Sequence, residues 1–182
     1  MNLNIVDSWA TRLQFRPLVA SDQAALWDWL HIALWDPPPA NLRPREVLDH
    51  PGVRIYAEHW GRPGDLGVVA VVDGRDGGAC WLRVLPTGIG LASIDARTPQ
   101  LGIALRPEFQ HQGIGARLMP ETLTRAWEAG FEEVALTVHP LNPALTLYER
   151  CGFRKREIRN GYHLMVARAP QSSSPSEHEP GS

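Results

Sequence analysis

The stretch RPEFQHQGIGARLM, residues 106–119, decides how this chain is organised. Glycines at positions 113 and 115 separate a proline-containing approach from an apolar helix pattern. Such a turn directs several backbone N–H groups at one point, because the first four N–H groups of a helix have no partner within it. Glycine lets a bulky ligand approach the backbone, and the helix dipole favours an anion. The stretch therefore predicts either a strand–helix turn that needs glycine for geometry alone or a cradle for a diphosphate.

Two common phosphate-binding motifs do not describe this stretch. A dinucleotide-binding turn has the pattern GxGxxG directly after the first strand. Here the turn lies late in the chain, and Leu118 stands where the third glycine would be. The GxxxxGK[ST] pattern of a phosphate loop is absent from the sequence. The glycines therefore need a different structural context to be interpreted.

The sequence around the stretch predicts a mixed α/β sheet. Strands are expected where apolar and polar residues alternate or apolar residues form short runs. Helices are expected where apolar residues recur at helical spacing behind a capping residue. The predicted strands are 11–18, 66–72, 78–86, 99–107, 132–139 and 162–169, and the predicted helices are 20–36, about 43–49, 116–130 and 142–153. Segment 53–60 is compatible with a strand or with an extension of the helical layer. The β-α-β order of the second half predicts a crossover unit.

Composition and length narrow the class of protein. The chain has 182 residues, of which 43% are hydrophobic and 21% charged, which favours one globular domain over residues 1–169. The segment 170–182 has no apolar periodicity, so we expect it to be a disordered tail. A formal net charge of −2 gives no concentrated basic surface, and we therefore expect no nucleic-acid partner.

The remaining bulk features concern location, redox state and metals. A signal peptide and a stretch long enough to span a bilayer are both missing from the sequence, so we expect a cytoplasmic protein without a membrane partner. Cys80 and Cys151 are far apart in sequence and are expected to be buried reduced thiols. The histidines show no ligand spacing, which predicts that no metal is bound.

The glycine stretch and a second block together resemble a known family. Residues Gln110 to Gly115 resemble the [R/Q]xxGx[G/A] signature of the GNAT superfamily of acyl-CoA-dependent N-acetyltransferases. The block NPALTLYERCGF, residues 142–153, resembles the helix and turn that follow in that family, and FRPLVASD, residues 15–22, resembles its first strand. The resemblance extends from about residue 12 to residue 168. It implies a bacterial-type single-domain member with an α/β fold, an α+β mixed sheet whose central strands splay apart.

The resemblance also implies a cofactor and the residues that bind it. Acetyl-CoA would be the co-substrate, lying between the fourth and fifth strands, and no metal would be needed. Asn142 would contact the pantetheine arm, or it would only cap its helix, and both interpretations stay open. The remaining cofactor-binding groups would be backbone atoms. Those that hydrogen-bond the pantetheine and the acyl carbonyl would belong to Ile103, Ala104 and Leu105. Those that hold the pyrophosphate would be the amides of His111, Gln112, Gly113, Ile114, Gly115 and Ala116.

For the chemistry, the resemblance implies direct transfer of an acetyl group to a primary amine in a ternary complex. Tyr148 would be the general acid that protonates the leaving thiolate. Many relatives carry a carboxylate base near the start of the fourth strand or within the fifth. Here those positions hold Gln100 and Thr137, neither of which is a base near neutral pH.

Four other side chains are candidates for the base by location alone: Glu58, His59, Asp95 and His139. A water relay or an amine of lower pKa would serve instead. Trp27 and Trp35 belong to the first helical region, where tryptophan is more often a core residue than a pocket residue.

The acceptor is expected to be a small-molecule amine or a protein or peptide amine, and an acyl group longer than acetyl stays open. The exposed strand edges of such sheets often pair, which leaves a homodimer open. The missing carboxylates also favour two rivals to an enzyme. One is a non-catalytic acyl-CoA-binding or regulatory module, and the other is an interaction protein that keeps only the fold.

Overall fold

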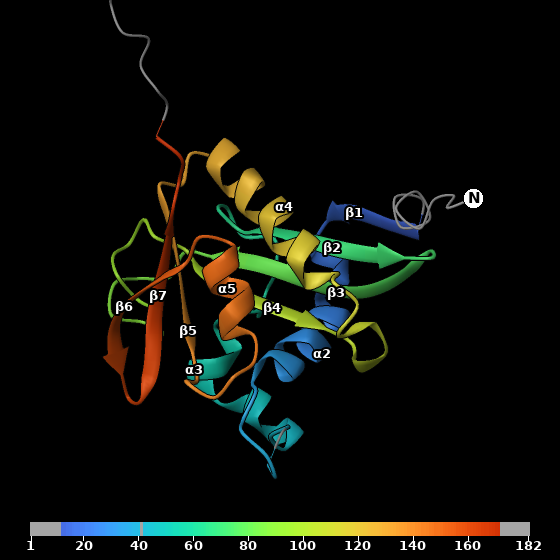
Figure 1. Ribbon diagram of the computed structural model, residues 1–182, viewed down its shortest axis with the longest axis horizontal. Helices are drawn as coiled ribbons and strands as arrows, with labels where there is room; N and C mark the ends of the chain where they lie inside the picture. The colour runs from blue at the N-terminus through green and yellow to red at the C-terminus, as the bar shows by residue number, and fades with distance from the viewer. Residues whose placement is uncertain (1–11, 41, 172–182) are drawn as a thin grey trace, which may run out of the picture.

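The computed structural model describes residues 12–40 and 42–171 (Figure 1). Most of the predicted tail, from residue 172 onward, lies outside the described residues. The strands are β1 Leu13–Pro17, β2 Leu66–Val72, β3 Arg75–Arg83, β4 Gln100–Leu105, β5 Glu133–Val138, β6 Arg154–Arg159 and β7 Tyr162–Arg168. The α-helices are α2 Gln23–Ala33, α3 Pro51–Arg54, α4 Gly115–Glu128 and α5 Leu145–Arg150. Short 3₁₀ helices occupy η1 Ala20–Asp22, η2 Arg45–Asp49 and η3 Pro107–Phe109.

One seven-stranded sheet runs through the molecule in the order β1-β2-β3-β4-β5-β7-β6. All neighbouring strands are antiparallel except β4 and β5, which are parallel. The register of β4 with β5 consists of one pair, Gln100 with Ala135, near the amino end of β4. The two strands therefore diverge toward their carboxyl ends, and the predicted mixed sheet with splayed central strands is confirmed.

Helices cover both faces of the sheet (Figure 1). Side chains on successive strand residues point to opposite faces. Val68 packs in the core beneath α4 and α5, whereas its neighbour Val69 packs in the core beneath α2. The first core includes Leu118 of α4, and the second includes Trp29 of α2 and Trp81 of β3. The gap between β4 and β5 is thus bordered by a different helical layer on each face.

Two-residue turns explain two of the differences from the elements predicted from sequence. Asp73 and Gly74 have φ values of +50° and +76°, as a type I′ hairpin turn requires. The strand β3 consequently begins at Arg75 instead of residue 78. It also ends earlier than predicted, at Arg83 instead of 86. Asn160 and Gly161 form a second such turn, with φ values of +48° and +80°. It joins β6 to β7, and β6 was missed because its sequence, RKREIR, is almost entirely charged.

Two further segments resolve an open alternative and a helix boundary. Segment 53–60 contains the end of α3 followed by turns, so the helical alternative holds and the strand alternative is wrong. Helix α5 spans Leu145–Arg150, which is shorter than the predicted 142–153, because residues 142–144 form the turn that leads into it. Trp27 is half-buried against the α2-side core, as expected of a mainly structural residue.

The turn before β2 is fastened to β3 by a buried ion pair. The side chains of Arg83 and Asp65 are 1% and 4% exposed, and their Nη2 and Oδ2 atoms lie 2.7 Å apart. Asp65 also accepts hydrogen bonds from the amides of Gly61 and Arg62, at 3.0 and 2.9 Å. Arg83 donates further to the carbonyl of Glu58, at 2.7 Å. Because both charges are fully paired and hydrogen-bonded, the segment 59–67 has a structural role that its sequence did not reveal.

Within residues 12–40 and 42–171, no helix is long and apolar enough to cross a membrane. The same residues contain no group of three side chains that could hold a metal ion. Cys80 is a buried free thiol, as predicted, whereas Cys151 is free but only half-buried.

Candidate active site

The glycine stretch forms a loop of unpaired backbone amides at the start of α4. His111 and Gly113 have φ values of +59° and +78°, which turns their N–H groups away from regular structure. No side chain caps α4. In the part of the chain that the structure describes, the amides of residues 111–116 donate no hydrogen bond. Because an unpaired amide needs water or a ligand, this loop has the donors of an anion-binding cradle.

Side chains of the loop and of α5 hold the cradle in shape. The Gln110 side chain donates to the carbonyl of Leu105 at 2.8 Å, and the Gln112 side chain donates to the carbonyl of Glu108 at 2.8 Å. A Cβ atom added to Gly115 would lie 3.3 Å from Cδ2 of Leu147 in α5. The cradle therefore lies directly against α5, and a side chain at position 115 would fit only if Leu147 moved slightly.

Along β4, the backbone N–H and C=O groups of every second residue face the gap between β4 and β5. The amide of Arg106 donates to the carbonyl of Gly77 in β3, at 2.9 Å. Because backbone groups alternate in direction along a strand, Ala104 also faces β3, whereas Ile103 and Leu105 face β5 across the gap. The carbonyl of Leu105 is already bonded to Gln110. Of the three strand residues predicted to bind the cofactor, the structure thus presents the backbones of Ile103 and Leu105 to the gap but not that of Ala104.

Tyr148 projects from α5 into the core beneath the sheet. Its ring packs edge-on against Phe153 with centroids 6.2 Å apart, and the residue is 9% exposed. Burial raises the pKa of Tyr148 above its ordinary value, and the nearby Cys80 raises it further. Among the described residues its hydroxyl has no hydrogen-bond partner, and the hydroxyl is not one of the fully enclosed polar atoms. The phenol is therefore protonated at neutral pH and free to donate.

Asn142 has the geometry of a cap on the turn before α5. Its Oδ1 atom accepts a hydrogen bond from the amide of Ala144 at 2.9 Å, and its carbonyl accepts one from the amide of Leu145 at 3.1 Å. These contacts close the turn that leads into α5. The residue directly before the helix is Ala144, where no side-chain capping bond forms, so Asn142 caps this turn and not the helix itself. Within the described residues the side-chain NH₂ donates no hydrogen bond, so a contact with the pantetheine arm stays a prediction.

On the opposite face, Gln100 holds a loop. Its amide nitrogen donates to the carbonyl of Ile89 at 2.7 Å, and its amide oxygen accepts from the hydroxyl of Tyr56 at 3.0 Å. Gln100 is 2% exposed, so these contacts satisfy it. Arg159 adds a second attachment by donating to the carbonyl of Leu91 at 3.0 Å. Gln100 and Arg159 together therefore fasten the loop 87–98 over the sheet.

Three of the candidate bases are poorly placed or already engaged. Asp95 accepts hydrogen bonds from the amides of Arg97 and Thr98, both at 2.8 Å, and these lower its pKa. It lines a hollow of about 590 Å³ that includes Glu133, at the amino end of β5, whereas the gap opens at the carboxyl end. The carboxylate of Glu58 lies 3.7 Å from each of two arginines. His59 is exposed on a turn with φ +51°.

His139, the fourth candidate, directly follows β5 at the open end of the gap. Its Nδ1 atom accepts a hydrogen bond from the amide of Leu141 at 3.1 Å. The neutral imidazole must therefore carry its proton on Nε2, which makes that atom a donor and argues against a base. The ring lies between Trp35 and Tyr162, with centroid distances of 5.8 and 5.6 Å.

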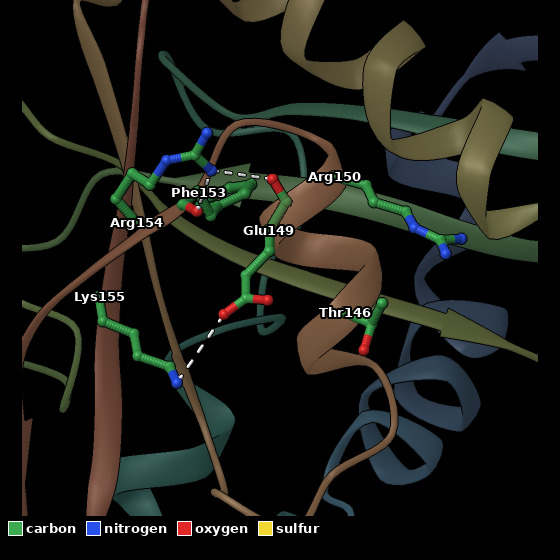
Figure 2. Close-up of a pocket in the computed structure, with 6 residues that line it drawn as sticks. All are labelled: Thr146, Glu149, Arg150, Phe153, Arg154 and Lys155. Carbon is green, nitrogen blue, oxygen red and sulfur yellow. Dashed lines mark hydrogen bonds and ion pairs between the residues drawn. The ribbon is translucent and has the colours of Figure 1, made fainter.

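A shallow basic hollow of about 660 Å³ lies beside α5 (Figure 2). Arg154 donates to the carbonyl of Glu149 at 2.9 Å, and Lys155 lies 3.8 Å from the Glu149 carboxylate. Figure 2 shows Arg150 extending away from these two cations, and it forms no ion pair with any described residue. Three cations against one carboxylate give this side of α5 a positive potential.

Sequence comparison places the chain in a family. The sequence model of the acetyltransferase (GNAT) family matches residues 26–153, which is more than half of the 182 residues. The chain belongs to the GNAT acetyltransferase family. No curated protein sequence matches it.

Solved acetyltransferases share the fold at low sequence identity. The PaiA N-acetyltransferase of Thermoplasma acidophilum, in complex with coenzyme A, is 17% identical with a TM-score of 0.62, over 86% of this chain and 99% of that one. A GNAT-family acetyltransferase of Streptococcus pneumoniae is 20% identical with a TM-score of 0.61, over 86% and 99%. The ribosomal-protein-alanine N-acetyltransferase of Brucella melitensis is 18% identical with a TM-score of 0.61, over 86% and 99%. These likenesses confirm the GNAT fold predicted from the glycine stretch.

Proposed function

We propose that the chain is an acetyl-CoA-dependent N-acetyltransferase that acts on a primary amine. The observation that carries the proposal is the run of unpaired amides at residues 111–116, next to the gap between β4 and β5. A diphosphate needs such donors, and a thioester arm needs a strand edge with free backbone groups. The PaiA structure contains coenzyme A, which supports the same ligand for this chain.

The residues present fit this co-substrate. The amides of residues 111–116 would bind the pyrophosphate, with Gly113 shaping the loop and the uncapped α4 adding its dipole. The backbones of Ile103 and Leu105 would bind the pantetheine arm. Helix α5 lies on the same face of the sheet as α4 (Figure 1), and the cations beside α5 favour a ligand with several phosphates.

The reaction follows from where the proton donors lie. Acetyl-CoA supplies the acetyl group as a thioester. The amine nitrogen attacks the carbonyl carbon, a C–N bond forms while the C–S bond breaks, and the Tyr148 hydroxyl donates its proton to the departing sulfur. The ammonium proton passes to solvent, from which the Tyr148 phenolate is protonated again. Burial raises the pKa of Tyr148, so the hydroxyl stays protonated until the thiolate leaves.

One test of this function is cofactor binding followed by turnover. Acetyl-CoA at saturating concentration should raise the melting temperature through linkage, and thiol should be released only when an amine is added. Tyr148→Phe should lower kcat by about 100-fold or more, as loss of a general acid does, while the melting shift with acetyl-CoA stays intact. The absence of any shift with acetyl-CoA or free CoA would refute the cofactor assignment.

A non-catalytic acyl-CoA-binding module is the second candidate. It is favoured by Gln100, which fills the usual position of the base with a residue that fastens a loop. A melting shift with acetyl-CoA but no thiol release across a broad amine panel would support this module over the enzyme.

A further inference from the structure

We propose that the acceptor carries a carboxylate next to its amine, and that Arg43, Tyr162 and His139 bind this carboxylate. The inference rests on the proposed function and specifies its substrate class. It is carried by five side chains that meet at the open end of the β4–β5 gap, on the α2 face. They are Trp35, Asp36, Arg43, His139 and Tyr162, and we call them the acceptor cluster.

The cluster is drawn from three distant segments and is held rigidly. Trp35 and Asp36 follow α2, and the isolated bridge between Trp35 and Leu42 brings Arg43 back beside them. The carbonyl of Arg43 lies 2.6 Å from Nε2 of His31 in α2, which anchors the returning chain. His139 and Tyr162 come from the end of β5 and the start of β7.

Arg43 is already oriented by a carboxylate but keeps one donor group. Its Nε and Nη2 atoms donate to the two oxygens of Asp36, at 2.7 and 2.9 Å. Nη2 also donates to the hydroxyl of Tyr162 at 3.3 Å. Within the described residues, Nη1 of Arg43 makes no hydrogen bond. The pair therefore fixes the plane of the guanidinium and leaves one charged edge available.

The other two polar groups are donors as well. The Tyr162 hydroxyl accepts from Arg43, so its own proton is free to point elsewhere. Nε2 of His139 carries the ring proton because Nδ1 is occupied by the amide of Leu141. Both oxygens of Asp36, the carboxylate of the cluster, accept from Arg43. Three donors without a free acceptor are complementary to an anionic oxygen pair.

This donor set selects between classes of amine. A polyamine would bring a second cation, and the cluster offers it only a carboxylate that Arg43 already engages. A carboxylate close to the amine would meet Arg43, Tyr162 and His139, while its amine lies toward the gap. Trp35 would supply an apolar wall for the rest of the molecule, since its ring is only half-buried. Free amino acids and similar small amino carboxylates have this form.

The test compares matched amines with the full chain and saturating acetyl-CoA, by thiol release. Each standard amino acid is assayed beside its decarboxylated amine and its carboxamide. Because the carboxylate would accept charge-assisted hydrogen bonds, the best amino acid should have a kcat/KM about tenfold to a hundredfold higher than its decarboxylated amine and its carboxamide. Equal rates for the acid and its carboxamide would overturn the carboxylate assignment and indicate a peptide-like acceptor. Preference for polyamines would overturn it too.

Substitutions in the acceptor cluster test whether these side chains cause the preference for acids. Arg43→Gln should raise the KM for the acid with little change in kcat, and should change the KM for the decarboxylated amine much less. Tyr162→Phe keeps the ring and should reduce the preference in part, which covers the case in which loss of Arg43 impairs folding. Arg45→Gln is the matched control, because Arg45 lies in the same segment but pairs with Asp28 at the surface.

The outcomes separate this inference from the function on which it rests. Acetylation of amines without any preference for acids would overturn only the substrate class. The absence of both thiol release and a melting shift with acetyl-CoA would overturn the proposed function itself. A preference that survives Arg43→Gln and Tyr162→Phe would remove the acceptor cluster from recognition.

Discussion

Replacing Gly113 with alanine should weaken CoA binding without destabilising the protein. Gly113 has φ +78°, a conformation that costs a residue with a side chain about 1–2 kcal/mol. The loop is exposed, and nothing lies within 4 Å of an added Cβ, so the free protein can relax away from the strain. The strain then reduces only the free energy of CoA binding, because the loop must return to the strained conformation around the pyrophosphate.

The magnitude follows from that strain. A cost of about 1–2 kcal/mol on binding corresponds to a Kd for CoA raised about 5- to 30-fold. Isothermal titration calorimetry of the native protein and the variant measures this ratio directly. Apart from its chain neighbours, no described residue lies within 4 Å of the added methyl group, so a ratio above this range would indicate direct contact between the methyl group and the bound ligand.

Gly130→Ala is the matched control. Gly130 has φ +91° and also has nothing within 4 Å of an added Cβ. It ends α4, where the amide of Phe131 donates to the carbonyl of Ala126 at 3.1 Å, and it must keep its conformation. Its strain should therefore appear as a loss of about 1–2 kcal/mol in unfolding free energy, with unchanged CoA affinity. A native Kd for Gly113→Ala beside a destabilised Gly130→Ala would refute the cradle.

Three other perturbations test the architecture around the site. Asp65→Ala leaves the buried guanidinium of Arg83 unpaired and should lower the unfolding free energy by about 3–5 kcal/mol in urea titrations; a loss below about 1 kcal/mol would contradict the buried pair. Hydrogen bonds from Arg16 lower the pKa of Asp22. The stabilisation that this pair provides is therefore present above the unfolded pKa of about 3.9 and is lost as pH falls through the folded pKa. Asp22→Asn should therefore be less stable than the native protein at pH 7, and this difference should shrink as pH falls through the folded pKa, whereas a difference independent of pH would refute the assignment. Gly90→Ala would place a Cβ 2.3 Å from Oε1 of Gln100, and proteolysis should then cut the loop that Gln100 holds more rapidly than in the native protein.

The sequence predicted the central part of the fold because one short motif carries strong local constraints. A glycine with positive φ, a helix start and a preceding strand are all local features, and residues 106–119 contain them together. The block 142–153 added its helix and Gly152, whose φ of +98° ends that helix. Strand β6 lacked such a signal in its own residues, although the Asn160–Gly161 pair is a hairpin turn that could have revealed it.

The acceptor side could not be predicted in the same way, because its residues meet only in the folded chain. Arg43 and Tyr162 are 119 positions apart and share a hydrogen bond. Neither stands in a motif, and each alone is an ordinary surface residue. The tautomer of His139 depends on the amide of Leu141, a detail of backbone geometry that residue types do not encode. The burial of Arg83 could not be predicted from the sequence either, because charged residues are usually exposed.

Because Gln100 anchors a loop and is not a base, the pKa of the acceptor amine should influence which acceptors react. Because no carboxylate stands at that position, we expect the amine to lose its proton to water before it reacts, so that amines already neutral at pH 7 should react faster. The α-amino group of a peptide, with a pKa of about 7.8, is neutral about 340-fold more often at pH 7 than a lysine side chain of pKa about 10.4. We therefore expect a protein that discriminates between acceptors by basicity as well as by shape. Its pH–rate profile should follow the titration of whichever amine it is given.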